Sequence, residues 1–149
     1  MNSRENLVFL GMMGSGKSSI GSIVSKKLNI DFIDIDQEIE KNLGMSIANS
    51  PLFKTAMAGS DSNWGRIIMA LGKTGVALNN SKISIKFGRF FILKFGQNLL
   101  LTNVKKINNY LKRKEIEISV TVGNGSGSSS VWTCDLTKNY ISINTDYRS

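Results

Sequence analysis

The sequence predicts a mixed α/β protein, with a strand–loop–helix–strand unit at its start and a longer α+β segment after it. Three observations lead to this prediction. The opening residues place an apolar run before a glycine-rich loop and a helical pattern. The later residues combine helical spacing with alternation of apolar and polar side chains. The chain has 149 residues and is 41% hydrophobic, so it holds enough apolar side chain for a buried core.

The first unit is predicted from its apolar pattern. Leu7–Leu10 is a short, continuous apolar run that ends in glycine, as a buried parallel strand does. Lys17–Leu28 carries apolar residues at helical intervals and predicts a helix. Phe32, Ile33 and Ile35 predict a second short strand, and residues 36–42 a second helix. This order of elements is typical of an open α/β sheet.

Caps and glycines predict the next helices. Pro51, with Asn49 or Ser50 as a cap, begins a helix that is broken at Gly59. Asp61 or Asn63 caps another helix over residues 64–71.

Apolar periodicity predicts the remaining elements. They are strands over 82–87, 90–95, 115–122, 131–136 and 140–143, and an amphipathic helix over 102–112. The glycine- and serine-rich stretch at 123–128 lies between two strand patterns, so it predicts a turn or a bulged strand.

A phosphate-binding loop is the sharpest motif. Residues 11–18 read Gly-Met-Met-Gly-Ser-Gly-Lys-Ser, which matches G-x-x-x-x-G-K-[ST]. The glycines let backbone N–H groups surround a phosphate, and the helix that follows adds its positive end. Lys17 is expected on the ATP phosphates and Ser18 on Mg²⁺. The predicted ATP- or phosphate-binding residues are Gly11, Gly14, Ser15, Gly16, Lys17, Ser18 and Ser19.

Two carboxylates follow this loop at the end of the second predicted strand. Asp34 and Asp36 flank Ile35, so both are expected to project from the same side. Ligands bind at the strand ends of open α/β sheets, and a carboxylate pair can hold a metal-bound water and a polyol substrate. A pair of helix-capping aspartates is the alternative.

The positive charge is unevenly distributed. The net charge is +8, yet residues 1–46 hold five Lys or Arg against six Asp or Glu, a net of −1, so residues 47–149 hold +9. The densest basic stretch is Lys105–Lys114, with Tyr110 as its only aromatic residue and no nucleic-acid motif. We therefore interpret these lysines as solvated and expect no nucleic-acid partner.

The rare residue types limit the chemistry and the compartment. There is no histidine, so a His-based catalytic triad is excluded. Cys134 is the single cysteine, which fits a reducing compartment, and its apolar surroundings predict a packed core thiol. Trp64 and Trp132 are expected to be packing residues. No apolar run approaches the roughly 20 residues of a membrane helix. We expect a cytoplasmic protein with no membrane partner.

Residues 1–48 resemble the N-terminus of shikimate kinase. The likeness rests on the phosphate loop, on Phe-Ile-Asp-Ile-Asp-Gln-Glu-Ile-Glu at 32–40, and on Gly-Met-Ser-Ile-Ala at 44–48. It implies that Asp34 lies near Mg²⁺ and that Asp36 binds shikimate hydroxyls, with ATP and Mg²⁺ as cofactors. The arginines that the family carries past Ala48, which stabilise the transferred phosphoryl group, are absent.

Residues 47–149 resemble the C-terminal part of the bifunctional ornithine acetyltransferase / N-acetylglutamate synthase (glutamate N-acetyltransferase) of arginine biosynthesis. The likeness rests on Ile-Ala-Asn-Ser-Pro-Leu-Phe-Lys-Thr-Ala at 47–56, Gly-Ser-Asp-Ser-Asn-Trp-Gly-Arg-Ile at 59–67, Val-Trp-Thr-Cys-Asp-Leu-Thr-Lys at 131–138 and Ile-Asn-Thr-Asp-Tyr-Arg-Ser at 143–149. It implies that Asn144 and Ser149 contact the amino-acid substrate, and it requires no cofactor.

The two resemblances meet at the junction Ser46-Ile47-Ala48, so we expect a chimera of residues 1–48 and 47–149. The family's nucleophilic threonine belongs upstream of Ile47, so no catalytic centre is expected to be complete. The longer likeness favours an inactive acetyltransferase whose substrates are N-acetylornithine and glutamate. The alternatives are an incomplete kinase for shikimate and ATP, and a non-functional gene fusion. Unpaired strands are expected to cause self-association or aggregation.

Overall fold

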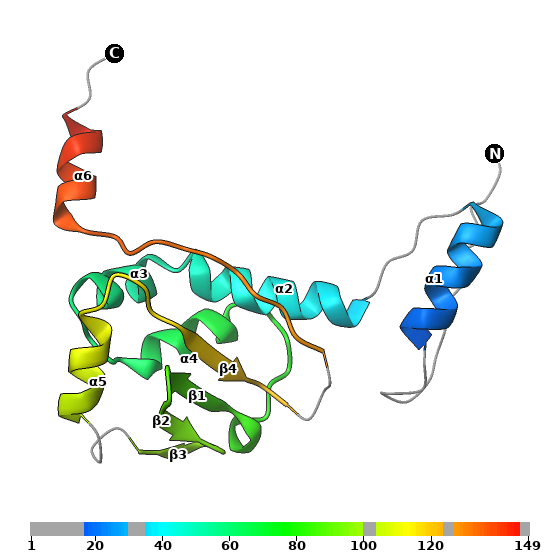
Figure 1. Cartoon of the computed structure of the whole chain (residues 1–149), viewed down its shortest axis with the longest axis horizontal. Coiled ribbons are helices and arrows are strands. Elements are labelled where there is room, and N and C mark those ends of the chain that lie inside the picture. Colours follow the sequence, from blue (N-terminus) through cyan, green and yellow to red (C-terminus); the bar gives the residue numbers. More distant parts are fainter. Residues whose placement is uncertain (1–16, 30–34, 100–103, 124–126, 147–149) are drawn as a thin grey trace.

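The computed structural model describes residues 17–29, 35–99, 104–123 and 127–146 (Figure 1). In chain order, the elements are α1 (Lys17–Leu28), α2 (Ile35–Ala48), α3 (Pro51–Ala58), α4 (Trp64–Gly72), a 3-10 turn (Asn80–Lys82), β1 (Ser84–Phe87), β2 (Phe90–Lys94), β3 (Gln97–Asn98), α5 (Val104–Leu111), β4 (Ile118–Thr121) and α6 (Lys138–Thr145).

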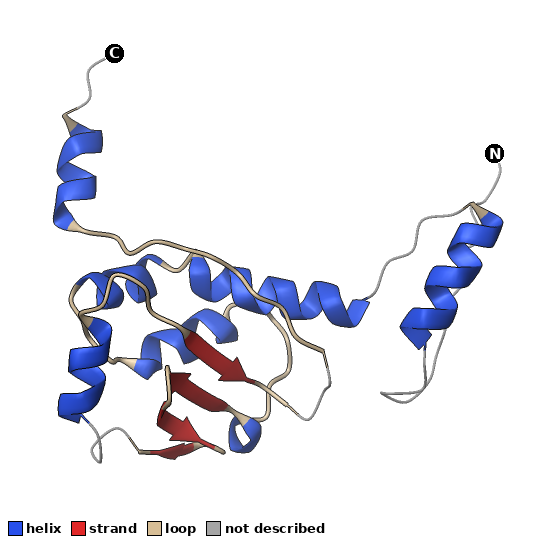
Figure 2. Cartoon of the chain, viewed as in Figure 1, coloured by secondary structure: helices blue, strands red, loops and turns tan. Residues whose placement is uncertain are grey.

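The four strands form one antiparallel sheet in the order β3-β2-β1-β4 (Figure 2). Ile85 of β1 lies opposite Leu93 of β2 on one side and Val120 of β4 on the other. The register of β1 and β2 shifts between Ile85 and Lys86, which is a β-bulge. The chain returns through α5 before β4 adds to the free edge of β1, so β4 is one edge strand of this sheet and β3 is the other.

A single hydrophobic core joins the sheet to helices α2–α5. Ile85 and Phe87 alternate along β1, as the period of a strand requires, and neither exposes measurable surface. Ile67 and Leu71 are one helical turn apart on α4 and are equally buried. The complete cluster is Leu43, Phe53, Ile67, Leu71, Ile83, Ile85, Phe87, Ile92, Leu93, Ile107 and Leu111.

Local signals confirm the prediction of α3 and α4. Ser50 caps α3, since its hydroxyl oxygen accepts from the Phe53 N–H at 3.4 Å, and Pro51 occupies the first turn. Asn63 precedes α4 as predicted, although its side chain makes no cap hydrogen bond. Arg66 ties the two helices together, because its guanidinium donates to the Leu52 carbonyl at 2.7 Å.

The structure corrects the predicted strand–loop–helix–strand unit. Helix α1 has the predicted bounds, but Ile35 begins helix α2 and does not end a strand. Helix α2 also runs six residues past Asn42, the predicted end. The strand Leu7–Leu10 lies outside the described residues, as do positions 30–34. The sheet that the described residues form is antiparallel, so the expected parallel sheet is not seen in them.

The predicted C-terminal strands are wrong. Residues 131–136 are extended but pair with no described strand, and residues 140–143 lie within helix α6. Thr137 explains the helix, because its hydroxyl oxygen accepts from the Tyr140 N–H at 3.1 Å and so caps the first turn. The expected burial also fails here: Cys134 is exposed, and Trp132 is 94% exposed. Trp64 does pack against the core, as predicted.

Candidate functional site

The predicted phosphate-binding loop lies largely outside the described residues. Gly11, Gly14, Ser15 and Gly16 precede them, and for Lys17 and Ser18 the structure describes the backbone alone. That backbone is the first turn of α1, and Ser19 follows as an exposed residue of the same turn.

The side chains of the two predicted carboxylates, Asp34 and Asp36, are also outside what the structure describes. Asp34 lies outside the described residues, and Asp36 contributes described backbone in the first turn of α2. The predicted ATP, Mg²⁺ and shikimate contacts of these side chains therefore stay predictions.

The junction between the two predicted segments lies in the last turns of α2. The Ser46 hydroxyl donates to the Ala70 carbonyl of α4 at 2.6 Å, and Ala48 is buried. Helix α2 is continuous through these residues. This part of the chain is thus joined to α4 by a short hydrogen bond.

The segment before α6 crosses helices α2 and α3 in an extended conformation (Figure 1). The Thr133 hydroxyl donates to the Ala48 carbonyl at 2.8 Å, which satisfies an acceptor that the end of α2 leaves free. The Leu136 N–H donates to the Lys54 carbonyl of α3 at 3.1 Å. At Gly44, a Cβ atom would lie 3.2 Å from both methyl groups of Val131, so glycine permits the close crossing. These contacts hold the residues just before α6 against α2 and α3.

Helix α6 presents the predicted substrate-binding residue Asn144 on an exposed surface. Its amide nitrogen donates to the Tyr140 carbonyl at 2.7 Å, which leaves the amide oxygen available to a ligand. None of the residues of α6 is buried. Ser149, the second predicted substrate contact, lies outside the described residues.

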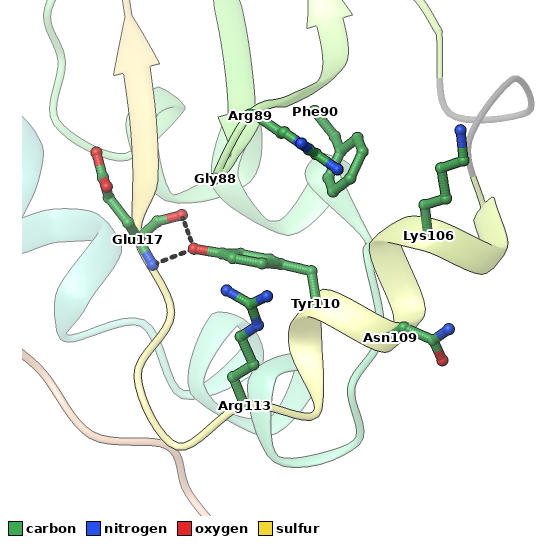
Figure 3. Close-up of a pocket in the computed structure, with 8 residues that line it drawn as sticks. All are labelled: Gly88, Arg89, Phe90, Lys106, Asn109, Tyr110, Arg113 and Glu117. Atoms are coloured by element: carbon green, nitrogen blue, oxygen red, sulfur yellow. Dashed lines mark hydrogen bonds between the residues drawn. The ribbon is translucent and has the colours of Figure 1, made fainter.

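A separate pocket of about 710 Å³ opens beside α5 (Figure 3). Three cationic side chains line it: Arg89 from the β1–β2 turn, Lys106 from α5, and Arg113 just after α5. The other lining residues are Gly88, Phe90, Asn109, Tyr110 and Glu117.

Tyr110 joins the parts of the chain that form this pocket. Its hydroxyl donates to the Glu117 carbonyl at 3.2 Å and accepts from the Glu117 N–H at 2.7 Å (Figure 3). The Gly88 N–H donates to the same carbonyl at 2.9 Å. The β1–β2 turn, helix α5 and the residue before β4 therefore meet at one backbone position.

The basic side chains of residues 105–114 are all exposed, as predicted, but that interpretation did not identify the pocket. A signal was present, because Lys106, Tyr110 and Arg113 are spaced as neighbours on one helix face. Arg89 carries no such signal, since it is brought there by the pairing of β1 with β4.

The fold and the C-terminal segment define a mixed α/β chain whose antiparallel sheet packs on helices and whose last helix is exposed. A model of the ArgJ family matches residues 27–149. The chain belongs to the ArgJ family. None of the described helices combines the length and the apolar composition that a bilayer crossing requires.

Individual relatives agree with this assignment. The arginine biosynthesis bifunctional protein ArgJ of Zymomonas mobilis is 50% identical over 115 residues, which are 77% of this chain and 28% of that protein. The protein of the same name from Caulobacter vibrioides is 48% identical over 109 residues, 73% of this chain and 27% of that protein. The chain therefore spans little more than a quarter of the length of these relatives.

A solved structure shares the fold. The crystal structure of the arginine biosynthesis bifunctional protein ArgJ from Bacillus halodurans superposes with a TM-score of 0.69 at 35% sequence identity. The match covers 74% of this chain and 52% of that one. The family match begins at residue 27, so it includes all of α2 and the junction at Ser46-Ile47-Ala48. The comparisons give no sign of a kinase segment or of a chimera in the matched residues.

Proposed function

We propose that this chain acts in acetyl transfer between N-acetylornithine and glutamate, as part of a glutamate N-acetyltransferase of arginine biosynthesis. The family match over residues 27–149 carries this proposal. Asn144 and Ser149 are the residues that would contact the amino-acid substrate. The exposed amide of Asn144 on α6 supports its role, because nothing among the described residues covers it.

The chain is proposed to be a scaffold and a substrate-binding segment, inactive when it is alone. Acyl transfer by this family requires a threonine nucleophile and oxyanion donors, which the resemblance places upstream of Ile47. An acyl-transfer site without those groups loses most of its rate enhancement.

A complementation assay tests this function. The full chain is mixed with the Zymomonas mobilis protein from which the matching segment has been removed, and acetyl transfer from N-acetylornithine to glutamate is measured. We expect no turnover from the chain alone and restored turnover from the mixture. Turnover by the pure chain would contradict the proposal that the chain is inactive alone. If the relative's own segment restores activity and this chain does not, the proposed function is wrong.

Matched variants on one helix test the role of Asn144. Asn144→Ala should lower turnover of the restored mixture about tenfold or more, because a hydrogen bond to a charged substrate group is lost. Lys138→Ala, on the first turn of the same exposed helix, should leave it unchanged. Equal effects of the two changes would indicate a general disturbance of α6.

Binding of ATP with Mg²⁺ is the second proposed function, with phosphorylation of shikimate as its kinase form. It is supported by helix α1, which contains Lys17 and follows the glycine pattern in the sequence, where a phosphate-binding loop needs its helix. Titration calorimetry with ATP and Mg²⁺ tests it, with Lys17→Ala as the variant and Lys26→Ala, in the last turn of α1, as the control. Binding that survives Lys17→Ala would rule this site out. The absence of any heat would mean that the chain does not bind ATP, and the segment around the glycine pattern would then be a non-functional fusion.

A further inference from the structure

Among the described residues, the lining of the pocket beside α5 holds more cationic side chains than carboxylates. Its lining holds three cations, Arg89, Lys106 and Arg113, and one carboxylate, that of Glu117. Among the described residues, the ion pair that the structure contains lies elsewhere, between Arg66 and Asp61 at 3.9 Å. The three cations thus have no ionic partner in the described part of the chain.

Aromatic rings hold the two arginines in position. The guanidinium carbon of Arg89 lies 5.2 Å from the centre of the Phe90 ring, and that of Arg113 lies 5.2 Å from the centre of the Tyr110 ring. The two rings meet edge to face at 6.5 Å. A guanidinium held against a ring face keeps the N–H groups at its edge free to donate. Both arginines therefore remain able to bind an anion.

Hydrogen bonds hold Tyr110 and Gly88 of the pocket in place without a ligand. Tyr110 is held by two hydrogen bonds to the Glu117 backbone, and Gly88 is bonded to the same carbonyl. Because these residues are already ordered, less conformational entropy is lost when a ligand binds. The volume of about 710 Å³ suits a small molecule.

We propose that this pocket binds a small anion with several negative charges, carried by phosphate or carboxylate groups. Arg89 and Arg113 would each donate paired N–H groups to anionic oxygens, and Lys106 would add a third charge. Asn109 of α5 also lines the pocket. The site is separate from the C-terminal segment, because its residues come from the β1–β2 turn, α5 and the start of β4.

Calorimetry of the full chain at low salt tests this proposal, with pyrophosphate and citrate as separate probes. Binding to at least one probe is expected with a dissociation constant below about 1 mM. Arg89→Gln and Lys106→Gln should each weaken it about tenfold, since each removes a hydrogen bond to a charged group. Lys138→Gln on α6 removes the same charge from a distant exposed position, so it should weaken binding less than about twofold.

The two probes separate the two possible ligand chemistries. Binding of pyrophosphate alone would assign phosphates, binding of citrate alone would assign carboxylates, and binding of both would assign a site that accepts either. Amide chemical shifts supply a second readout, because a ligand in the pocket should move the signals of Gly88 and Asn109 in the wild-type chain. The absence of binding, or equal losses in Lys106→Gln and Lys138→Gln, would overturn the proposal.

Discussion

Replacing Gly88 with alanine is expected to destabilise the fold at the point where three elements meet. Gly88 has a φ of +55°, in the left-handed region that side chains disfavour. An alanine Cβ would also lie 2.8 Å from two ring carbons of Tyr110. Carbon atoms prefer a separation of about 3.5 Å or more, so the ring must move.

The size of the effect follows from these contacts. The left-handed conformation costs alanine about 1–2 kcal/mol. Displacing the ring endangers two hydrogen bonds between Tyr110 and Glu117, each worth about 0.5–1.5 kcal/mol net. Alanine restricts the unfolded chain and returns up to about 1 kcal/mol. We expect Gly88→Ala to lower the free energy of unfolding by about 2–3 kcal/mol.

Urea denaturation followed by circular dichroism measures this loss. Gly72→Ala is the matched control, because a Cβ there would meet no atom within 4 Å. It should leave stability unchanged or raise it by up to about 1 kcal/mol. The Tyr110→Ala background removes the clash, so Gly88→Ala should then cost only about 0–2 kcal/mol. A cost below about 0.5 kcal/mol in the wild-type background would refute this reasoning.

Three further changes test other parts of the molecule. Ile67→Ala should lower the free energy of unfolding by about 2–5 kcal/mol, measured in urea, because Ile67 is fully buried; a smaller loss would mean that the core is loosely packed. Ser46→Ala should lower it by about 1 kcal/mol, since the bond to the Ala70 carbonyl is lost; no change would show that this bond contributes nothing. The edge strand β4 should support concentration-dependent self-association in sedimentation velocity, and Thr121→Lys should reduce it; a monomer at all concentrations would contradict this expectation.

The sequence predicted those elements whose signals are local. Ser50 and Pro51 both act within one turn of the helix they begin, so α3 was predicted closely. The β1–β2 strands follow from the alternation of Ile83 and Ile85 with polar residues before Gly88 and from the apolar run 90–93 after it. Elements that depend on distant partners were not predictable in this way. Residues 131–136 carry an apolar pattern typical of a strand, yet Thr133 and Leu136 donate hydrogen bonds to helices α2 and α3.

The candidate sites show the same difference between local signals and distant partners. The position of Asn144 near the C-terminus was predicted by resemblance, but its helix was mistaken for a strand because the cap at Thr137 was overlooked. The basic pocket could be anticipated for Lys106 and Arg113, which share a helix face. Arg89 lies beside them because the neighbouring Gly88 N–H donates to the Glu117 carbonyl, next to the pairing of β1 with β4. The local sequence around Arg89 does not indicate this pairing.

The crossing of α2 by the late segment has a consequence during synthesis on the ribosome. Thr133 follows its partner Ala48 by 85 residues. At a translation rate of about 5–20 residues per second, roughly 4–17 s pass before this partner is made. During that interval the Gly44 face of α2 lacks its cover, while α3, α4 and the first hairpin are being made. This face of α2 therefore stays open to solvent and to chaperones until the segment around Thr133 has been made.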